Sequence, residues 1–346
     1  MVRLGIVGAG WWAQEVHAPA FQGAGARIQG VYAAGSPRAE ALARAYGARA
    51  YKDYAALLED VEAVAISTPD TAHVPLALEA VRRGRHVFLE KPVGVSLEEA
   101  LALLQAVEEE GVVAMTALTA RADWAAETAL AHRERLGEVL VFRGAFLADY
   151  LADPLSPLPW RARVSGGGPA GVVGDLGPHL FDLAAWILGH PLEQVQARTA
   201  VLFPGRENPD WAGVLAKAGR AQGVLELSRV HPVRPQALFL ELEGEKGALR
   251  VVPALAGRAE EAGLFFSERP GSWNPLPLDA GFLRGRDPRE PWGLFHFREL
   301  AQRFLRAIQK GEPPTPSLRE GVVAQAAIQA VLESAEEGRE KEVTRV

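Results

Sequence analysis

The chain has 346 residues, of which 48% are hydrophobic and 23% charged, and its formal net charge is −6. This length exceeds what one hydrophobic core usually supports, so we expect two folded domains. An acidic balance without a long basic run argues against nucleic acid as a partner. With no cysteine, the chain has neither disulfides nor a thiolate metal site. No secretory signal and no membrane-spanning apolar run is visible, so we expect a cytoplasmic protein with a small-molecule partner.

Up to about residue 118, short apolar runs alternate with segments of helical period, which is the pattern of a parallel sheet with crossover helices. The expected strands are Leu4–Val7, Arg27–Tyr32, Ala63–Ser67, His86–Leu89 and Val112–Thr116. The expected helices are Ala13–Phe21, Pro37–Tyr46, Ala72–Arg83 and Leu97–Glu110. Ser96 and Glu99 form a capping box before the last of these helices. Residues 1–118 are therefore predicted to be an α/β Rossmann dinucleotide-binding domain.

After residue 135 the pattern changes to longer β-rich runs joined by turns. The expected strands are Val139–Leu147, Val195–Phe203, Ala212–Lys217, Gly223–Val230, Leu238–Leu242 and Ala248–Val252. Their spacing predicts hairpins and a mostly antiparallel sheet. The expected helices are Leu180–Leu188, Phe295–Gln309 and Gly321–Glu336. Residues 119–346 are therefore predicted to be a second domain, of the α+β class, with a large, mostly antiparallel sheet.

A glycine-rich loop follows the first expected strand directly. Its sequence, Gly8-Ala9-Gly10-Trp11-Trp12-Ala13, is a G-x-G-x-x-A motif that leads into a helix. Glycine at Gly8 and Gly10 allows a tight turn and a close approach of the backbone to a pyrophosphate, which the helix amides can bind. The alternative is a turn that only packs a helix on the sheet. The position of the loop favours cofactor binding by Gly8, Gly10, Trp11 and Trp12.

The end of the second expected strand carries the signal for cofactor preference. An acidic residue there would bind the ribose hydroxyls of NAD, but the sequence reads Ala33-Ala34-Gly35-Ser36-Pro37-Arg38. Ser36 and Arg38, next to Ala34, are suited to a 2′-phosphate. The alternative is a helix start with Ser36 as its N-cap, and both roles are compatible. The sequence therefore favours NADP over NAD.

Polar residues also follow the third and fourth long strands. Ser67-Thr68-Pro69-Asp70 and His73 come after one, and Glu90-Lys91-Pro92 after the other. The carboxyl ends of these strands meet at the edge where ligands bind in such sheets. We expect Ser67, Thr68, Pro69, His73, Glu90 and Lys91 to contact the cofactor, and Lys91 to hold a substrate oxygen. Alternatives are a helix cap by Asp70 and a salt bridge that steers a proline turn at Glu90-Lys91.

A second cluster follows a glycine-rich stretch in the second domain. Asp175 and His179 are four residues apart, and Asp182 follows. On a helix this spacing brings Asp175 beside His179, and an imidazole next to a carboxylate is a suitable general base near neutral pH. A helix start with a packed histidine is the alternative. One histidine with spaced aspartates lacks the usual zinc ligand set, so we expect no metal.

Taken together, these motifs resemble the Gfo/Idh/MocA family, which includes glucose-fructose oxidoreductase and inositol dehydrogenase relatives. The resemblance rests on Gly8-Ala9-Gly10, Thr68-Pro69, Glu90-Lys91-Pro92, Trp160-Arg161 and Asp175-Leu176-Gly177-Pro178-His179. It implies that Lys91, Asp175 and His179 are the catalytic set and that Arg121, Trp160 and Arg161 help to bind substrate. It also implies a cis Lys91-Pro92 peptide bond. Finally, it implies that residues 119–346 bind the substrate and form a homodimer or homotetramer through an open second sheet.

The sequence therefore predicts an NAD(P)-dependent oxidoreductase that moves a hydride between nicotinamide and a sugar, polyol or cyclitol-like substrate. In this hypothesis His179 removes the hydroxyl proton, Lys91 stabilises the developing alkoxide and Asp175 orients the imidazole. One alternative is an NAD-dependent glycoside hydrolase of the same fold, which product analysis would identify. Another is a non-catalytic relative that senses the cofactor, against which the presence of all three residues argues.

Overall fold

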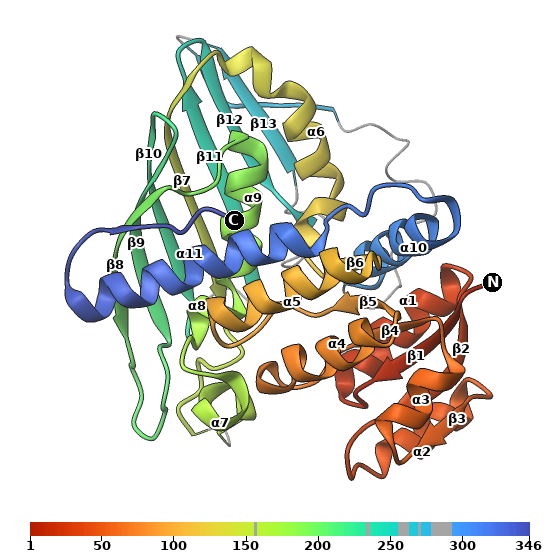
Figure 1. The fold of residues 1–346 in the computed structure, drawn as a ribbon. Coiled ribbons are helices and arrows are strands. Elements are labelled where there is room, and N and C mark those ends of the chain that lie inside the picture. The colour runs from red at the N-terminus through yellow and green to blue at the C-terminus, as the bar shows by residue number, and fades with distance from the viewer. Residues whose placement is uncertain (156–157, 233–235, 255–262, 269–270, 278–292) are drawn as a thin grey trace. The chain divides into compact units, whose positions relative to one another are not determined.

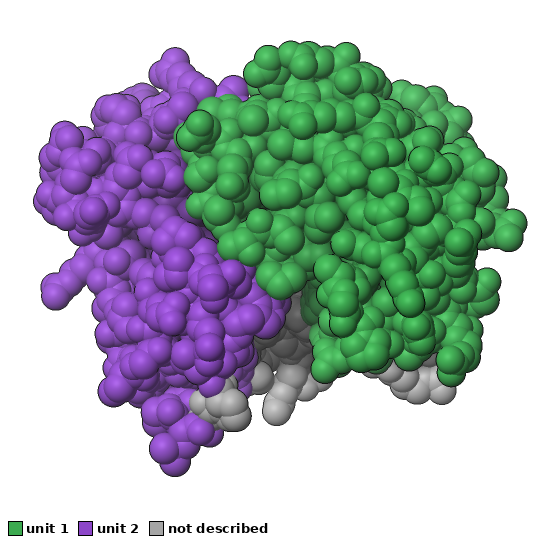
Figure 2. Space-filling view, turned by 60° about the horizontal axis from the view of Figure 1, so that its bottom comes forward, with its two compact units in different colours: residues 1–119, 287–322 green, residues 120–286, 323–346 purple. Residues whose placement is uncertain are grey.

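The computed structural model describes residues 1–346 except 156–157, 233–235, 255–262, 269–270 and 278–292 (Figure 1). The chain forms two compact units, coloured separately in Figure 2. Unit 1 contains residues 1–119 and 287–322, and unit 2 contains residues 120–286 and 323–346. Each unit has its own sheet.

Unit 1 is built on a six-stranded parallel sheet with the strand order β3-β2-β1-β4-β5-β6. The strands are β1 (Arg3–Val7), β2 (Arg27–Tyr32), β3 (Arg49–Tyr51), β4 (Ala63–Ile66), β5 (His86–Leu89) and β6 (Ala114–Thr116). The central strands are buried almost throughout, because helices cover parallel sheets on both faces. The strand order reverses between β1 and β4, and ligands in such sheets bind outside the carboxyl ends at this point.

The crossover helices of unit 1 confirm the Rossmann prediction. They are η1 (Ala13–His17, a π-helix), α1 (Ala18–Gly23), α2 (Arg38–Ala45), α3 (Tyr54–Asp60), η2 (Asp70–Ala72, a 3-10 helix), α4 (His73–Arg82) and α5 (Leu97–Glu110). At α5, the Ser96 hydroxyl accepts a hydrogen bond from the Glu99 amide at 3.2 Å, as expected. The Glu99 carboxylate, however, accepts from the amide of Val95 at 3.3 Å. The capping box is therefore offset by one residue.

Two short elements of unit 1 are not predicted by the sequence pattern. Strand β3 has only three residues, and α3 has seven, both shorter than the windows in which periodicity is visible. Asp53 caps α3, since its carboxylate accepts hydrogen bonds from the amides of Ala55 and Ala56 at 3.3 Å.

Helix α10 (Leu294–Lys310) belongs to unit 1, whereas the sequence pattern predicts that residues 287–322 belong to the second domain. The physical reason is aromatic packing. The ring centroid of Phe297 lies 5.4 Å from that of Trp12, and that of Phe304 lies 6.1 Å from that of Phe21. Aromatic pairs at such distances are favourable beyond the area that they bury, so a late segment of the chain completes the first core.

Unit 2 is built on a nine-stranded sheet with the order β14-β13-β12-β11-β7-β10-β9-β8-β15. Its strands are β7 (Val139–Ala148), β8 (Gln194–Ala200), β9 (Trp211–Ala218), β10 (Ala221–Ser228), β11 (Gln236–Gly244), β12 (Gly247–Val252), β13 (Gly263–Glu268), β14 (Asn274–Pro275) and β15 (Lys341–Glu342). Among the strands that the structure describes in this sheet, only β7 and β10 pair in parallel, and the other pairs are antiparallel. The mostly antiparallel second sheet is therefore confirmed.

Helices cover one face of this sheet. Those with residues in unit 2 are η3 (Thr119–Ala122), α6 (Trp124–His132), η4 (Arg133–Leu136), η5 (Trp160–Ala162), α7 (Val164–Gly167), α8 (Val172–Asp175), α9 (Gly177–Leu188) and α11 (Leu318–Glu337). Helix α9 packs on β7 and β11, and α6 on β12 and β13. Along β10 buried and exposed residues alternate, so the opposite face remains uncovered by these helices. Among the described residues, no helix is long and apolar enough to cross a membrane.

Candidate active site

The glycine loop after β1 contains two glycines with different structural demands. Gly8 has φ +112°, and a Cβ added there would lie 2.4 Å from the carbonyl oxygen of Ser67. The fold therefore requires glycine at this position. Gly10 has no such constraint, because a Cβ added there would meet nothing within 4 Å. Trp11 beside it is 59% exposed. The open space at Gly10 leaves room for the close approach of a phosphate.

The loop after β2 has a local structure that agrees with the helix-start interpretation. The Ser36 hydroxyl accepts a hydrogen bond from the amide of Arg38 at 3.3 Å, and the Ala39 amide donates to the Ser36 carbonyl at 3.2 Å. Helix α2 begins at Arg38. Ala34 and Arg38 are both exposed. Capping by Ser36 leaves the Arg38 guanidinium on the surface, so this geometry agrees with both of the roles expected for the loop.

The loop after β4 presents hydroxyl groups that the chain itself leaves unused. Ser67 Oγ and Thr68 Oγ1 are buried, and neither has a hydrogen-bond partner among the residues that the structure describes. A buried hydroxyl without a partner is costly, and in native proteins it calls for an explanation such as a bound ligand or water. Pro69 follows directly and leads into η2 at Asp70. The donor and acceptor set at this strand end therefore fits a polar ligand.

His73, which begins α4, ties this loop to the next one. Its Nδ1 lies 2.7 Å from the carbonyl oxygen of Pro92, and its Nε2 lies 3.0 Å from the carbonyl oxygen of Thr68. Burial lowers the pKa of His73, although both backbone contacts and the nearby charge of Glu90 act in the opposite direction. Both ring nitrogens of His73 thus contact backbone carbonyls, and these contacts connect the loop after β4 to the loop after β5.

The Glu90-Lys91-Pro92 segment follows β5 at the same edge of the sheet. The Lys91-Pro92 peptide bond is cis, as predicted. Glu90 is 8% exposed. Its Oε1 accepts hydrogen bonds from Trp12 Nε1 at 2.7 Å and from His17 Nε2 at 2.8 Å. Its Oε2 accepts from the Lys91 amide at 3.2 Å. Both oxygens of the Glu90 carboxylate therefore already accept hydrogen bonds from groups of the same chain.

The electrostatic state of Glu90 follows from these contacts. Burial alone would raise its pKa, but the hydrogen bonds from His17 and Trp12 and the charges of His17 and Lys91 together lower the pKa below its ordinary value. Glu90 is therefore an anion at neutral pH, directly before Lys91 in the sequence.

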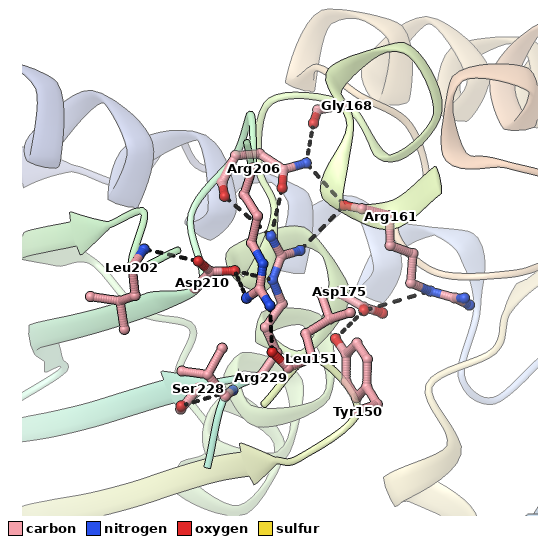
Figure 3. Close-up of polar contacts among 12 residues, drawn as sticks. Tyr150, Leu151, Arg161, Gly168, Asp175, Leu202, Arg206, Asp210, Ser228 and Arg229 are labelled. Carbon is pink, nitrogen blue, oxygen red and sulfur yellow. Dashed lines mark hydrogen bonds and ion pairs between the residues drawn. The ribbon is translucent and has the colours of Figure 1, made fainter. Parts of the chain in front are cut away.

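Asp175 and His179 lie in unit 2, at the end of α8 and in the first turn of α9. The phenol of Tyr150 donates a hydrogen bond to Asp175 Oδ2, and Arg161 Nε lies 3.6 Å from the same oxygen (Figure 3). Desolvation and the charge of Asp175 raise the pKa of Tyr150 well above its ordinary value. The His179 ring lies 5.8 Å from that of Phe146 on β7. Tyr150 thus remains a protonated donor to Asp175.

The other predicted substrate-binding residues also have partners within unit 2. Arg121 is 7% exposed, and its guanidinium binds Asp182 through Nε at 2.9 Å and Nη2 at 2.7 Å. Such a buried two-point pair anchors η3 to α9. The Arg161 guanidinium lies 4.3 Å from the ring centroid of Trp160. Substrate contact by Arg121, Trp160 and Arg161 stays a prediction.

A buried polar network supports the loop that carries Arg161 (Figure 3). Arg229 and Asp210 are fully buried, and Arg229 Nε donates to Asp210 Oδ1 at 3.0 Å. Arg229 Nη1 and Asn208 Nδ2 both donate to the Arg161 carbonyl, at 3.2 and 3.0 Å. Asn208 Nδ2 also donates to the Gly168 carbonyl at 2.9 Å. Since a satisfied buried network is rigid, it fixes both ends of this loop.

Sequence reasoning missed several residues of these clusters. They are His17, Tyr150, Asn208, Asp210 and Arg229. The last three lie in a segment without any motif, and Tyr150 lies just after β7 in a stretch that carries no motif either. Among the described residues, no group of three or more histidine, aspartate or glutamate side chains is arranged to hold a metal ion.

Comparisons with known proteins agree with the folds of both units. A family model described as "Oxidoreductase family, NAD-binding Rossmann fold" matches residues 2–118, and a model of the GFO/IDH/MocA C-terminal domain matches residues 125–250. The chain is 29% identical to inositol 2-dehydrogenase of Rhizobium meliloti over 98% of both chains. It is 27% identical to levoglucosan dehydrogenase of Pseudarthrobacter phenanthrenivorans over 86% of this chain and 84% of the relative. An NAD binding oxidoreductase from Klebsiella pneumoniae shares its fold over 100% of both chains, with a TM-score of 0.87 and 26% identity.

Proposed function

Because the chain belongs to the Gfo/Idh/MocA family of oxidoreductases, whose first domain is an NAD-binding Rossmann fold, we propose that it oxidises or reduces one carbon of a sugar, polyol or cyclitol. The observation that carries the proposal is the edge of the first sheet. Three features follow strand ends at this edge: the open position at Gly10, the hydroxyls of Ser67 and Thr68 without a partner among the described residues, and the Glu90-Lys91 pair. Two relatives named for inositol and for levoglucosan support the substrate class.

The cofactor would be held by unit 1. The amides of the loop Gly8–Trp12 suit its pyrophosphate, and the hydroxyls of Ser67 and Thr68 suit the polar groups of its nicotinamide half. When bound, the nicotinamide supplies the carbon that exchanges hydride with the substrate.

The substrate chemistry belongs to three side chains. Lys91 donates to the substrate oxygen and stabilises its negative charge as the proton leaves. His179 accepts that proton, since a neutral imidazole is a suitable base near neutral pH. Asp175, held by Tyr150 and Arg161, stabilises the imidazolium that forms. Bringing Lys91 and His179 to the same substrate is part of the proposal.

We further propose that the enzyme prefers NADP. No carboxylate follows Tyr32 to bind the ribose hydroxyls of NAD, and the exposed Arg38 is suited to pair with a 2′-phosphate. The hydrogen bond from the Arg38 amide to Ser36 leaves the guanidinium itself available for this role.

The test is the formation of reduced nicotinamide, measured by absorbance with each cofactor and a panel of sugars, polyols and cyclitols. We expect one substrate class to give turnover that falls strongly in His179→Ala. Arg38→Ala should weaken NADP binding by about tenfold or more and NAD binding hardly at all, because a charge-assisted pair is lost for NADP alone. Turnover of no panel member, or equal losses for both cofactors, would contradict the respective proposal.

The uncovered face of the second sheet is the surface that we propose for a homodimer or homotetramer. Val141, Leu215 and Val224 are 36%, 54% and 54% exposed, and Val224 lies opposite Leu215 in the β9–β10 pair. An apolar patch of this kind is typical of an interface. The charged side chain introduced by Val224→Glu should disrupt this interface and lower the mass measured by light scattering.

We also propose a cytoplasmic location, since a chain without cysteine does not depend on an oxidising compartment.

A further inference from the structure

The π-helical turn η1 places two side chains on one oxygen atom. The amide of Ala18 donates to the carbonyl of Ala13, five residues earlier, which defines the π turn. In an α-helix, residues five positions apart point about 140° away from each other, since each residue turns the helix by about 100°. In a π turn they lie on the same side. Trp12 and His17 are five apart, and both donate to Glu90 Oε1.

The His17 side chain is specialised for this contact. It is fully buried, and its Nδ1 has no hydrogen-bond partner among the described residues. Its ring packs among Phe21, Phe88 and Phe297, at centroid distances of 6.4, 5.8 and 4.9 Å. An apolar ring would fill the same space without leaving Nδ1 unsatisfied. The hydrogen bond to Glu90 therefore explains why this buried position carries a histidine and not an apolar ring.

We propose that Trp12 and His17 are positioning residues for Lys91: they hold the Glu90 carboxylate as a fixed anion beside it and so set the place and charge of its amine. The inference rests on the proposed function, since it takes Lys91 as the group that meets the substrate oxygen. Trp12 ends the glycine loop, so the same contacts connect the cofactor loop to the catalytic lysine. π turns within helices are frequent at functional sites.

Charged and titratable groups from three parts of the first unit interact with Glu90. His17 and Lys91 face its carboxylate, and His73 on α4 interacts with both Glu90 and Lys91 through charge. Replacing Glu90 by a neutral residue therefore removes an anion that attracts the Lys91 ammonium group, so we expect the Lys91 side chain to be held less tightly and to react more readily. This effect needs neither cofactor nor substrate, so it can be measured when neither is present.

The test is the rate at which acetic anhydride labels Lys91 in the full chain across a pH series, read by peptide mass spectrometry. Lys52, which is exposed, serves as the internal standard. In Glu90→Gln we expect Lys91 to react about tenfold faster than in the wild type below pH 9, the low end for loss of a nearby opposite charge. In His17→Phe the same change should be smaller. Adding His17→Phe to Glu90→Gln should change nothing further, because both act through one carboxylate.

Two controls separate this role from packing. His17→Gln retains a donor at the position of Nε2 and should restore the wild-type rate. Phe21→Leu disturbs the same aromatic cluster without touching Glu90 and should also label like the wild type. If His17→Phe does not fold, Trp12→Phe takes its place. Equal Lys91 rates in the wild type, Glu90→Gln and the donor variants would overturn the inference. Failure of the proposed function would instead appear as absence of turnover, whatever the labelling shows.

Discussion

Two carboxylates with proposed roles in the reaction, one in each unit, differ in the donors that surround them. Glu90 accepts from the buried His17 and from Trp12, both held by one helical turn. Asp175 accepts from Tyr150, which is 38% exposed, and lies near Arg161, whose side chain is 43% exposed. The donors to Glu90 are more enclosed than those to Asp175, since His17 is buried and Trp12 is half-buried. We therefore expect Glu90 to act through its position and Asp175 to act closer to the substrate.

The largest expected effects come from neutralising each carboxylate in turn. Asp175→Asn should lower turnover about a thousandfold, within the range of general base catalysis. It should cost at most about 1 kcal/mol of stability, because the amide oxygen can still accept from Tyr150 and an ion pair with the partly exposed Arg161 contributes little. Glu90→Gln should lower turnover only about tenfold. The same substitution should cost about 1–3 kcal/mol of stability. The NH2 group of glutamine cannot accept a hydrogen bond, so it leaves a buried donor next to position 90 unsatisfied.

The measurements are kcat on the identified substrate and urea unfolding of the same preparations. The comparison fails if the two variants show the reverse pattern, with Asp175→Asn destabilised and Glu90→Gln inactive but stable.

The strand ends of unit 1 were predictable because motif and position agree. The first strand, the glycine loop and the Glu90-Lys91-Pro92 segment each occupy the place that the alternation of strands and helices gives them. The partners of Glu90 were not predictable in the same way. Trp12 and His17 share a helix face only because of the π turn, and their spacing of five indicates no contact under α-helical periodicity.

In unit 2 the sequence predicted the sheet but not its polar network. The alternation of apolar residues marks the long strands, such as β10. Asp210 and Arg229, by contrast, are 19 residues apart and meet only because β9 and β10 pair. Such contacts depend on register, which a single sequence does not state. The same holds for α10, whose amphipathic pattern predicts a helix but not which core it completes.

A second pair of variants extends the comparison to the glycine loop. Gly8→Ala should destabilise the protein by about 2 kcal/mol or more, since φ is positive and the added Cβ would collide with the backbone of Ser67. Gly10→Ala should leave the free energy of unfolding within about 0.5 kcal/mol of the wild type. It should nevertheless weaken cofactor binding about tenfold or more, because the methyl group would occupy the phosphate path. Thermal unfolding and a cofactor titration distinguish the two. Unchanged cofactor affinity in Gly10→Ala would argue against the phosphate site.

The smallest expected effect concerns His73, which joins the two loops next to these residues. Burial lowers the pKa of His73, so the unfolded chain binds the proton more readily than the folded protein does. Its contribution to stability is therefore present above the unfolded pKa, about 6.5, and is lost as the pH falls through the lower folded value. His86 adds a contribution of the same sign, since burial lowers its pKa as well.

The informative quantity is thus the difference between wild type and His73→Gln in urea unfolding, measured on both sides of pH 6.5. The free energy of unfolding of the wild type should decrease relative to that of His73→Gln as the pH falls. The opposite trend would mean that the carbonyls of Pro92 and Thr68, which face both ring nitrogens, stabilise the imidazolium more than burial disfavours it.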